Sequence, residues 1–305
     1  MLWFFLALIG PFLYAVTNYI DKVLLEKYFK QGGVGTLLIV SSLLTALVLP
    51  FLFIVDPTVF DISPLHAAVL AVVGALHVLV LFFYLKALES EEVSITVVFY
   101  QMVPVFALGL GFLILGETLA PLQLLAMALV ILGTSIVSFE VDAESGFRMR
   151  TKTIFYMLAA SLCWALGSVI FKAVALEEEV IRSLFWEHLM QTLIGIGLLV
   201  FVASYRSHFL EAIRTNSKAI LSLNVLNEVL YMGGNIFFAF AYLLAPVALV
   251  LLAESYQPLF ALLIGLFLTL VFPHIIKEKI HVKHLWQKGF AIAITGIGTY
   301  LLFIS

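Results

Sequence analysis

Two similar heptapeptides decide the fold of this chain: YQMVPVF at residues 100–106 and ESYQPLF at residues 254–260. In each, a proline lies midway along an apolar segment, and a polar residue precedes it by one helical turn. Duplication within apolar sequence is typical of membrane proteins that bind a ligand between two related halves. We therefore predict a membrane protein with a central site.

The composition supports a helical membrane protein. Hydrophobic residues make up 63% of the 305 residues, charged residues 11%, and the mean hydropathy is +1.15, values outside the range of soluble domains. A membrane helix needs about 20 apolar residues, whereas a membrane barrel strand has about 10 residues of alternating polarity. The apolar segments of this chain are too long and too uniform for barrel strands. We predict an all-α fold with ten transmembrane helices, at residues 2–20, 34–55, 65–88, 93–115, 119–139, 154–175, 183–204, 219–244, 247–272 and 289–304.

The ten segments divide into two repeats of five. Residues 1–140 form the first repeat, residues 141–153 a polar linker and residues 154–305 the second repeat. At an offset of 150, Tyr14 aligns with Trp164 and Lys22 with Lys172; at an offset of 154, Pro104 aligns with Pro258. Because five is odd, the second repeat enters the membrane from the opposite side. The sequence thus predicts an inverted-topology repeat, which suits alternating access to a site at mid-membrane depth.

The basic residues fall on one side of this topology. That side has Lys22, Lys27, Lys30, Lys86, Arg148, Arg150, Lys152, Arg206, Arg214, Lys218, Lys277, Lys279, Lys283 and Lys288, whereas the other side has only Lys172 and Arg182. The positive-inside rule places the richer side in the cytoplasm and both termini outside. Short loops and the lack of long tails favour the cytoplasmic (inner) membrane of a prokaryote.

A polar stripe marks the segment at residues 219–244. It consists of Asn224, Asn227, Glu228, Tyr231 and Asn235, spaced i, i+3, i+4, i+7 and i+11 on one helical face. In lipid such a face points inward, so we predict that it lines a substrate cavity. The aligned segment of the first repeat keeps only His77, opposite Tyr231. Interhelical hydrogen bonding is the alternative role for these residues.

The two prolines mark the broken helices. Pro104 and Pro258 leave the carbonyls of Tyr100 and Glu254 without their helical donors, and such a carbonyl in the membrane needs another partner. We predict helix kinks at both prolines; a kink satisfied by packing and a bound substrate are both open. Tyr100, Gln101, Glu254 and Gln257, which lie at these two prolines, are further substrate-binding candidates.

Two more groups complete the predicted site. Carboxylates within a span are functional candidates, so Glu254 and Glu228 are our candidates for proton coupling. Tyr14 and Asn18 share a face of the first segment and Trp164 is their counterpart in the sixth, which adds all three to the predicted substrate-binding residues. Lys22 and Lys172 lie at helix ends, where we expect their side chains to reach toward the membrane surface.

These features resemble the drug/metabolite transporter superfamily, in its ten-helix EamA-like branch. The resemblance rests on the five-plus-five pattern, the Tyr14-Ala15 and Trp164-Ala165 pairs, the mid-helix prolines and the Gly116-Glu117 turn. It implies a secondary carrier, often an exporter of small metabolites, without an ATP site. Members are usually drawn with cytoplasmic termini, in contrast to the charge count. The substrate is not implied.

We therefore predict a secondary active transporter, an exporter of a small polar or zwitterionic metabolite, and not an enzyme. Its partners would be a small-molecule substrate and the lipid bilayer, with no nucleic acid, no catalytic residues and no cofactor. His281 and His284 have a metal-like spacing but no ligand cluster beside them, so we predict no metal site. The alternative is a non-transporting membrane subunit or a component of a lipid-linked sugar flippase. The oligomeric state stays open.

Overall fold

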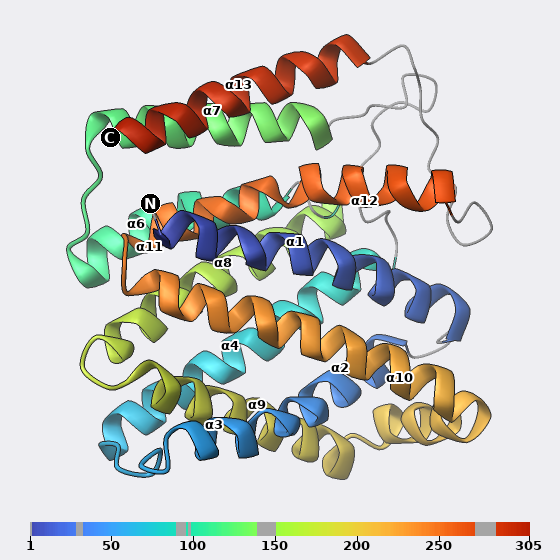
Figure 1. Ribbon diagram of the computed structural model, residues 1–305. Helices are drawn as coiled ribbons and strands as arrows, with labels where there is room; N and C mark the ends of the chain where they lie inside the picture. Colours follow the sequence, from blue (N-terminus) through green and yellow to red (C-terminus); the bar gives the residue numbers. More distant parts are fainter. Residues whose placement is uncertain (1, 29–32, 90–95, 97–98, 139–150, 272–284) are drawn as a thin grey trace.

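The computed structural model describes residues 2–28, 33–89, 96, 99–138, 151–271 and 285–305 (Figure 1). Every regular element in these ranges is a helix, which confirms the all-α prediction. Most of the predicted linker at residues 141–153 lies outside the described residues. So do the first residues of the segment at 93–115, Glu278 and the histidines at positions 274, 281 and 284.

The first half of the chain contains both continuous helices and helices interrupted or extended by a short π or 3-10 segment. They are α1 (Leu2–Val23) with the π-turn η1 (Leu24–Tyr28), α2 (Gly33–Leu44) with η2 (Thr45–Leu47) and α3 (Leu49–Val55), α4 (Pro64–Leu88), η3 (Phe99–Gln101) with α6 (Met102–Leu115), and α7 (Pro121–Ser138). The first helix continues beyond residue 20, where the sequence predicted its end.

The second half follows the same order. Its helices are α8 (Thr151–Ala175), α9 (Val180–Phe201), α10 (Ala203–Tyr242), α11 (Val247–Leu251) with the 3-10 turn η4 (Leu252–Tyr256) and α12 (Gln257–Val271), and α13 (Leu285–Ile304).

Six helical stretches in the described residues are long and apolar enough to cross a membrane: Leu2–Tyr28, Gly33–Val55, Pro64–Leu88, Thr151–Ala175, Val180–Phe201 and Val247–Gly265. Three shorter apolar helices, Phe99–Leu115, Pro121–Ile136 and Gly289–Ile304, fall at other predicted segments. The remaining predicted segment lies in α10, which carries the polar stripe. The chain is thus a multi-pass membrane protein, and the number of ten spans stays a prediction.

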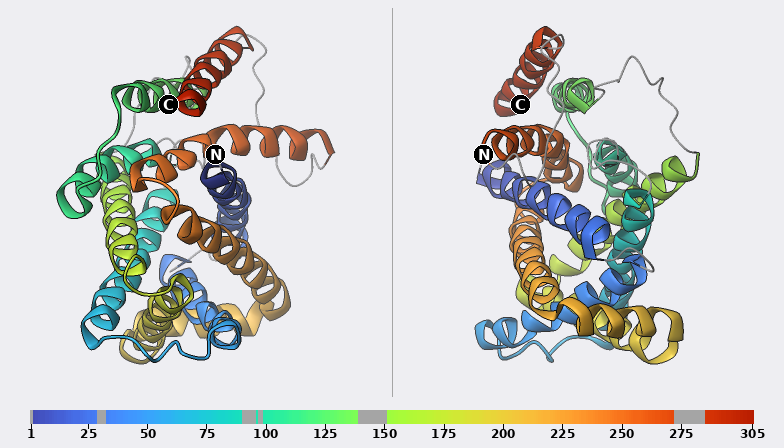
Figure 2. Two further views of the ribbon diagram at one scale, coloured as in Figure 1. Left: turned by 60° about the vertical axis from the view of Figure 1, so that its left-hand side comes forward. Right: turned by 90° about the vertical axis from the view of Figure 1, so that its right-hand side faces the viewer.

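The helices pack in pairs that are related by exchanging the two halves. Helix α4 packs on α8 and α9, and the aligned helix α10 packs on α1 and α2; likewise α6 contacts α8, and α12 contacts α1. Helices α7 and α13 pack against each other at one edge of the bundle, where they run in opposite directions (Figures 1 and 2). Both termini lie at the same end of the bundle.

Two glycines allow local geometry that other residues would disturb. Gly116 ends α6 with a left-handed φ of 67°, and its N–H bonds the carbonyl of Phe112 at 3.1 Å, as in an αL C-cap. The N–H of Glu117 bonds the carbonyl of Gly111 at 3.1 Å. This turn fixes where the Glu117 side chain begins. Gly234 of α10 lets Tyr14 of α1 approach closely, since a Cβ at this position would lie 2.5 Å from a Tyr14 ring carbon.

Candidate functional site: a central acidic cavity

Each mid-helix proline lies just after a turn of 3-10 helix. Pro104 is the third residue of α6, which follows η3, and Pro258 is the second residue of α12, which follows η4. A proline in the first turn of a helix loses no hydrogen bond, because that N–H has no helical acceptor. The breaks place Tyr100 and Glu254 on tight, non-α turns, and η3 and η4 contact each other.

A cavity of about 80 Å³ lies beside these two turns, between α1, α2, α4, α8 and α10. Ten predicted binding residues line it: Tyr14, Asn18, His77, Tyr100, Trp164, Asn227, Glu228, Tyr231, Glu254 and Gln257. They come from both halves of the chain. The structure therefore gathers most of the predicted site into one space.

The other three predicted residues lie away from this cavity. Gln101 joins the broken helices, because its Nε2 donates to the carbonyl of Ser255 at 3.1 Å and its Oε1 accepts from Thr134 at 3.2 Å. Asn224 donates to the carbonyl of Ile220 in its own helix at 2.7 Å. Asn235 lines a second, smaller cavity.

The sequence analysis missed several lining residues, of which Asp21 is the most important. Its Oδ1 accepts a hydrogen bond from Nδ2 of Asn227 at 2.8 Å, which links the two halves. Tyr14, Asn18 and Asp21 follow one another at i, i+4 and i+7, a spacing that puts them on one helical face. The further polar residues that line the cavity are Thr17, Ser41, Ser42, Thr45, Tyr84 and Gln191.

The cavity is acidic and contains unpaired hydrogen-bonding atoms. The carboxylates of Asp21, Glu228 and Glu254 line it, and none of its lining residues is a lysine or an arginine. Glu254 is 2% exposed, and its Oε1 has no protein partner. Oδ1 of Asn227 and Oε1 of Gln257 are also buried without a protein hydrogen-bond partner. Buried polar atoms are normally satisfied, so these atoms are positioned for a ligand or water.

A second cavity of about 10 Å³ shares His77 and Trp164 with the first. Its wall also contains Glu187, whose Oε1 is bound by Nδ1 of His77 at 2.7 Å, Nε2 of Gln191 at 3.0 Å and Nδ2 of Asn235 at 3.3 Å. With three partners, this carboxylate oxygen is satisfied by the protein alone. In contrast to Glu254, it is therefore a structural group that holds α4, α9 and α10 together.

Several residues that line the two cavities align with one another at the predicted repeat offsets. Ser168 and Phe171 of the smaller cavity align with Asn18 and Asp21 of the larger one at the offset of 150. Phe238 aligns with Tyr84 at the offset of 154. The larger cavity extends toward the ends of α1 and α4, and the smaller one toward the ends of α8 and α10.

An ion pair closes the bundle beyond the smaller cavity. The ammonium of Lys172, at the end of α8, lies 2.5 Å from Oε1 of Glu117 and donates to the carbonyl of Ala245 at 2.8 Å. The other Glu117 oxygen accepts from the N–H of Val247, at the start of α11, at 2.8 Å. One carboxylate thus ties together the turn before α7, the end of α8 and the α10–α11 connection.

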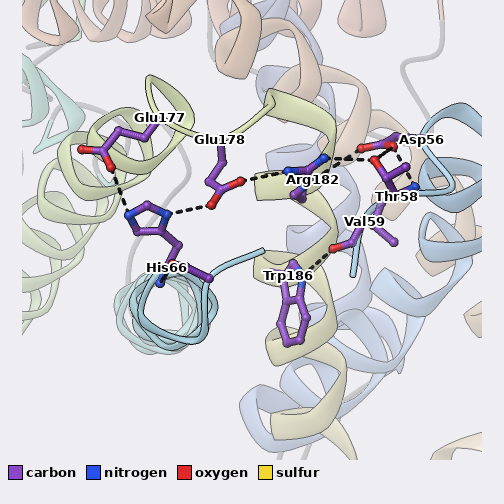
Figure 3. A network of polar contacts seen from close by, with 9 residues as sticks. Asp56, Thr58, Val59, His66, Glu177, Glu178, Arg182 and Trp186 are labelled. Carbon is purple, nitrogen blue, oxygen red and sulfur yellow. Dashed lines mark hydrogen bonds and ion pairs between the residues drawn. The ribbon is translucent and has the colours of Figure 1, made fainter. Parts of the chain in front are cut away.

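A second polar network holds the two halves together at the helix ends between α3 and α4 and between α8 and α9 (Figure 3). The His66 ring lies between Glu177, at 3.2 Å, and Glu178, at 2.8 Å. Arg182 reaches from Glu178, at 3.0 Å, to the hydroxyl of Thr58, at 2.9 Å. This network joins the first half of the chain to the second.

Both acidic anchors of the network are held in their charged form. Hydrogen bonds from Thr58 keep the pKa of Asp56 below its usual value. The hydrogen bond with His66 does the same for the pKa of Glu178, with a further contribution from Arg182. Both carboxylates are therefore charged near neutral pH. The network also includes the bond from Nε1 of Trp186 to the carbonyl of Val59 at 2.7 Å.

The fold and the cavity define a multi-pass membrane protein with a polar chamber lined by residues from both halves of the chain. Comparison with known families points to its class: residues 1–139 match the model of the EamA-like transporter family, which is part of the drug/metabolite transporter superfamily. This confirms the resemblance inferred from the sequence. The family is one of membrane transporters rather than enzymes.

Structural comparison agrees with this fold. One solved structure, described as "Crystal structure of protein", aligns over 96% of this chain and 96% of its own, with a TM-score of 0.59 and 14% sequence identity. At this identity the likeness concerns the fold alone. No curated protein matches the sequence. Among the described residues, no group of three His, Cys, Asp or Glu side chains is arranged to hold a metal ion.

Proposed function

We propose that this chain is a secondary active transporter that exports a small polar or zwitterionic metabolite by alternating access, with protons as the coupling ion. The observation that carries the proposal is the central cavity, which receives carboxylates from both halves: Asp21 from the first, and Glu228 and Glu254 from the second. A buried carboxylate in a membrane protein marks a substrate or proton pathway by default.

The proposed architecture is a pair of five-helix repeats with inverted topology. Three observations support it: the sequence offsets, the exchange-related packing of α4 with α8 and of α10 with α1, and the opposite directions of the aligned helices α7 and α13 (Figure 1). Inverted repeats favour alternating access, since exchanging the conformations of the halves moves the opening from one side to the other.

The two cavities correspond to the two access routes of such a carrier. The larger route reaches Asp21 and Tyr84 near the basic helix ends, and the Lys172–Glu117 pair closes the smaller route. Phe171 in the smaller route aligns with Asp21 in the larger one, so the smaller route has an aromatic ring where the larger has a carboxylate. We place the basic helix ends, and with them the acidic route, in the cytoplasm of a prokaryotic cell. The substrate would then bind from the cytoplasm through the acidic route and leave through the aromatic route, which is export.

Glu254 and Glu228 are the proposed proton carriers. An ionised carboxylate inside the membrane is costly unless a cation or a proton neutralises it. The unpartnered Oε1 of Glu254 suits this exchange, because substrate and proton compete for the same oxygen. Asp21, which is bonded to Asn227, lies on the same cavity wall and joins them as a third acidic group.

The test is proton movement in proteoliposomes that enclose a pH-sensitive dye. A mixture of amino acids, amines and nucleosides is added outside, and the wild type is expected to change the internal pH relative to empty vesicles. Glu254→Gln and Glu228→Gln should each abolish the change, whereas Glu89→Gln, in an exposed pair with Lys86, should not.

Two outcomes would contradict the proposal. If both cavity variants keep uptake and its pH dependence, the coupling mechanism is wrong. If wild-type and empty vesicles respond alike to every probe, the chain is a non-transporting membrane subunit or flippase component.

A further inference from the structure

We propose that the substrate of the central cavity is a monovalent organic cation, a protonated or methylated amine on an apolar body, whose ammonium group binds Glu254 within a ring of aromatic side chains. This inference rests on the proposed transport function and narrows it. Among amine-bearing substrates it favours cations over zwitterions.

The charges around the cavity favour a ligand with no carboxylate of its own. Three carboxylates line the cavity, and its lining residues include no lysine or arginine. Basic groups on the same helices are already engaged: His77, which lines the cavity, pairs with Glu187, Lys22 with Glu26, and Lys172 with Glu117. The carboxylate of a zwitterion would therefore face like charges without a cationic partner, and burying such a group is unfavourable.

The unpaired atoms favour a ligand that donates hydrogen bonds. Three buried side chains on the wall, Glu254, Gln257 and Asn227, each have an acceptor oxygen without a partner. The amide orientation of Asn227 is set by its bond to Asp21. The unpartnered donors on the wall are Nδ2 of Asn18, whose oxygen accepts from Tyr84, and the hydroxyls of Tyr14 and Ser42, which can also accept. An ammonium group supplies up to three donors and no acceptor, which complements the three acceptor oxygens, while the two hydroxyls can accept as well as donate.

Four aromatic rings, packed against one another in a row, line the same cavity as Glu254. The ring centroids of Tyr14 and Trp164 are 5.7 Å apart, those of Tyr14 and Tyr231 5.4 Å, and those of Tyr100 and Trp164 6.0 Å. All four rings line the cavity with Glu254. Electron-rich ring faces attract cations, and desolvated aromatic cages bind methylated ammonium groups. The rings also offer apolar surface to the body of the ligand.

The experiment uses four probes that share one phenyl ring and differ in charge. They are phenethylamine, its N,N,N-trimethyl derivative, phenylalanine and 3-phenylpropionate. Binding to the purified protein in detergent is measured by thermal stabilisation and by quenching of tryptophan fluorescence, since Trp164 lines the cavity. We expect both cations to bind. Phenylalanine should bind with an affinity lower by about tenfold or more, and the propionate should not bind.

Variants test the residues. Glu254→Gln should weaken cation binding by about tenfold or more, and Trp164→Leu should weaken the trimethyl derivative most because it lacks N–H donors. Glu89→Gln is the control. The comparison of the four probes on the wild type needs no variant, so it holds even if a substitution prevents folding.

The result that would overturn the inference is equal or tighter binding of phenylalanine or of the propionate, or no binding of any probe. Unchanged cation affinity in a folded Glu254→Gln variant would overturn it as well. These outcomes leave the transport function standing if proteoliposomes still move protons with other substrates. Tight cation binding without any proton movement would instead contradict the proposed transport function and leave the cation-binding proposal standing.

Discussion

Replacing Lys172 with glutamine removes the positive charge that ties the end of α8 to the turn before α7. The pair is partly buried, with Lys172 9% and Glu117 16% exposed. Removing one partner of a fully buried pair costs about 3–5 kcal/mol. Here Glu117 keeps the hydrogen bond from Val247, so we expect about 2 kcal/mol, which shifts the balance between closed and open forms roughly 30-fold.

Cysteine labelling can measure this opening, because Cys163 is the only cysteine in the sequence. In a Cys163→Ala background, Ser168→Cys places a thiol on the wall of the smaller cavity. A membrane-impermeant maleimide added on the side of the termini should label it faster when Lys172→Gln is also present. Lys86→Gln, at an exposed pair near the other end, is the matched control. An unchanged or slower labelling rate in the Lys172 variant would refute the closing role of the ion pair.

Two further predictions concern stability. Gly234→Val should lower the thermal unfolding temperature by an amount equivalent to roughly 1–3 kcal/mol, because its Cβ would lie 2.5 Å from Tyr14, whereas Gly197→Ala, with no atom near its Cβ, should not. Asp56 and Glu178 have lowered pKa values, so they stabilise the fold above their usual values of 3.8 and 4.5, and this stability is lost as the pH falls through their folded pKa values. Thermal unfolding at a series of acidic pH values should show this loss, and the double variant Asp56→Asn, Glu178→Gln should show less of it.

The polar stripe of α10 shows how far helical periodicity predicts a site. Periodicity gave the inward face, and Asn227, Glu228 and Tyr231 line the cavity. Asn224 and Asn235 share the face but lie 11 residues apart, or about 16 Å along the helix. On α10 the lining of the cavity extends only from Asn227 to Tyr231. Periodicity determines the direction of a side chain, whereas the extent of the cavity along the helix depends on how neighbouring helices pack.

The sequence analysis missed Asp21 because it predicted too short a first helix. The first segment was predicted to end at residue 20, where charged residues begin, which made Asp21 a boundary residue. In the structure α1 continues to Val23, and the π-turn η1 extends it to Tyr28. Asp21 is therefore inside the bundle, 6% exposed. Hydropathy places a helix end at the first charges, and only the packing of α10 shows that this charge is buried.

Lys22 and Lys172 show why aligned residues in a repeat need not have the same role. The sequence placed both at helix ends and predicted that both side chains reach toward the membrane surface. In the structure Lys172 crosses to Glu117, whereas Lys22 bonds the carbonyl of Leu88 at 3.3 Å and lies 3.3 Å from Glu26 of its own helical segment. In the proposed alternating mechanism one end is closed at a time, so the two lysines are expected to make different contacts in any one conformation. On that proposal, the ion pair with Glu117 assigns Lys172 to the closed end.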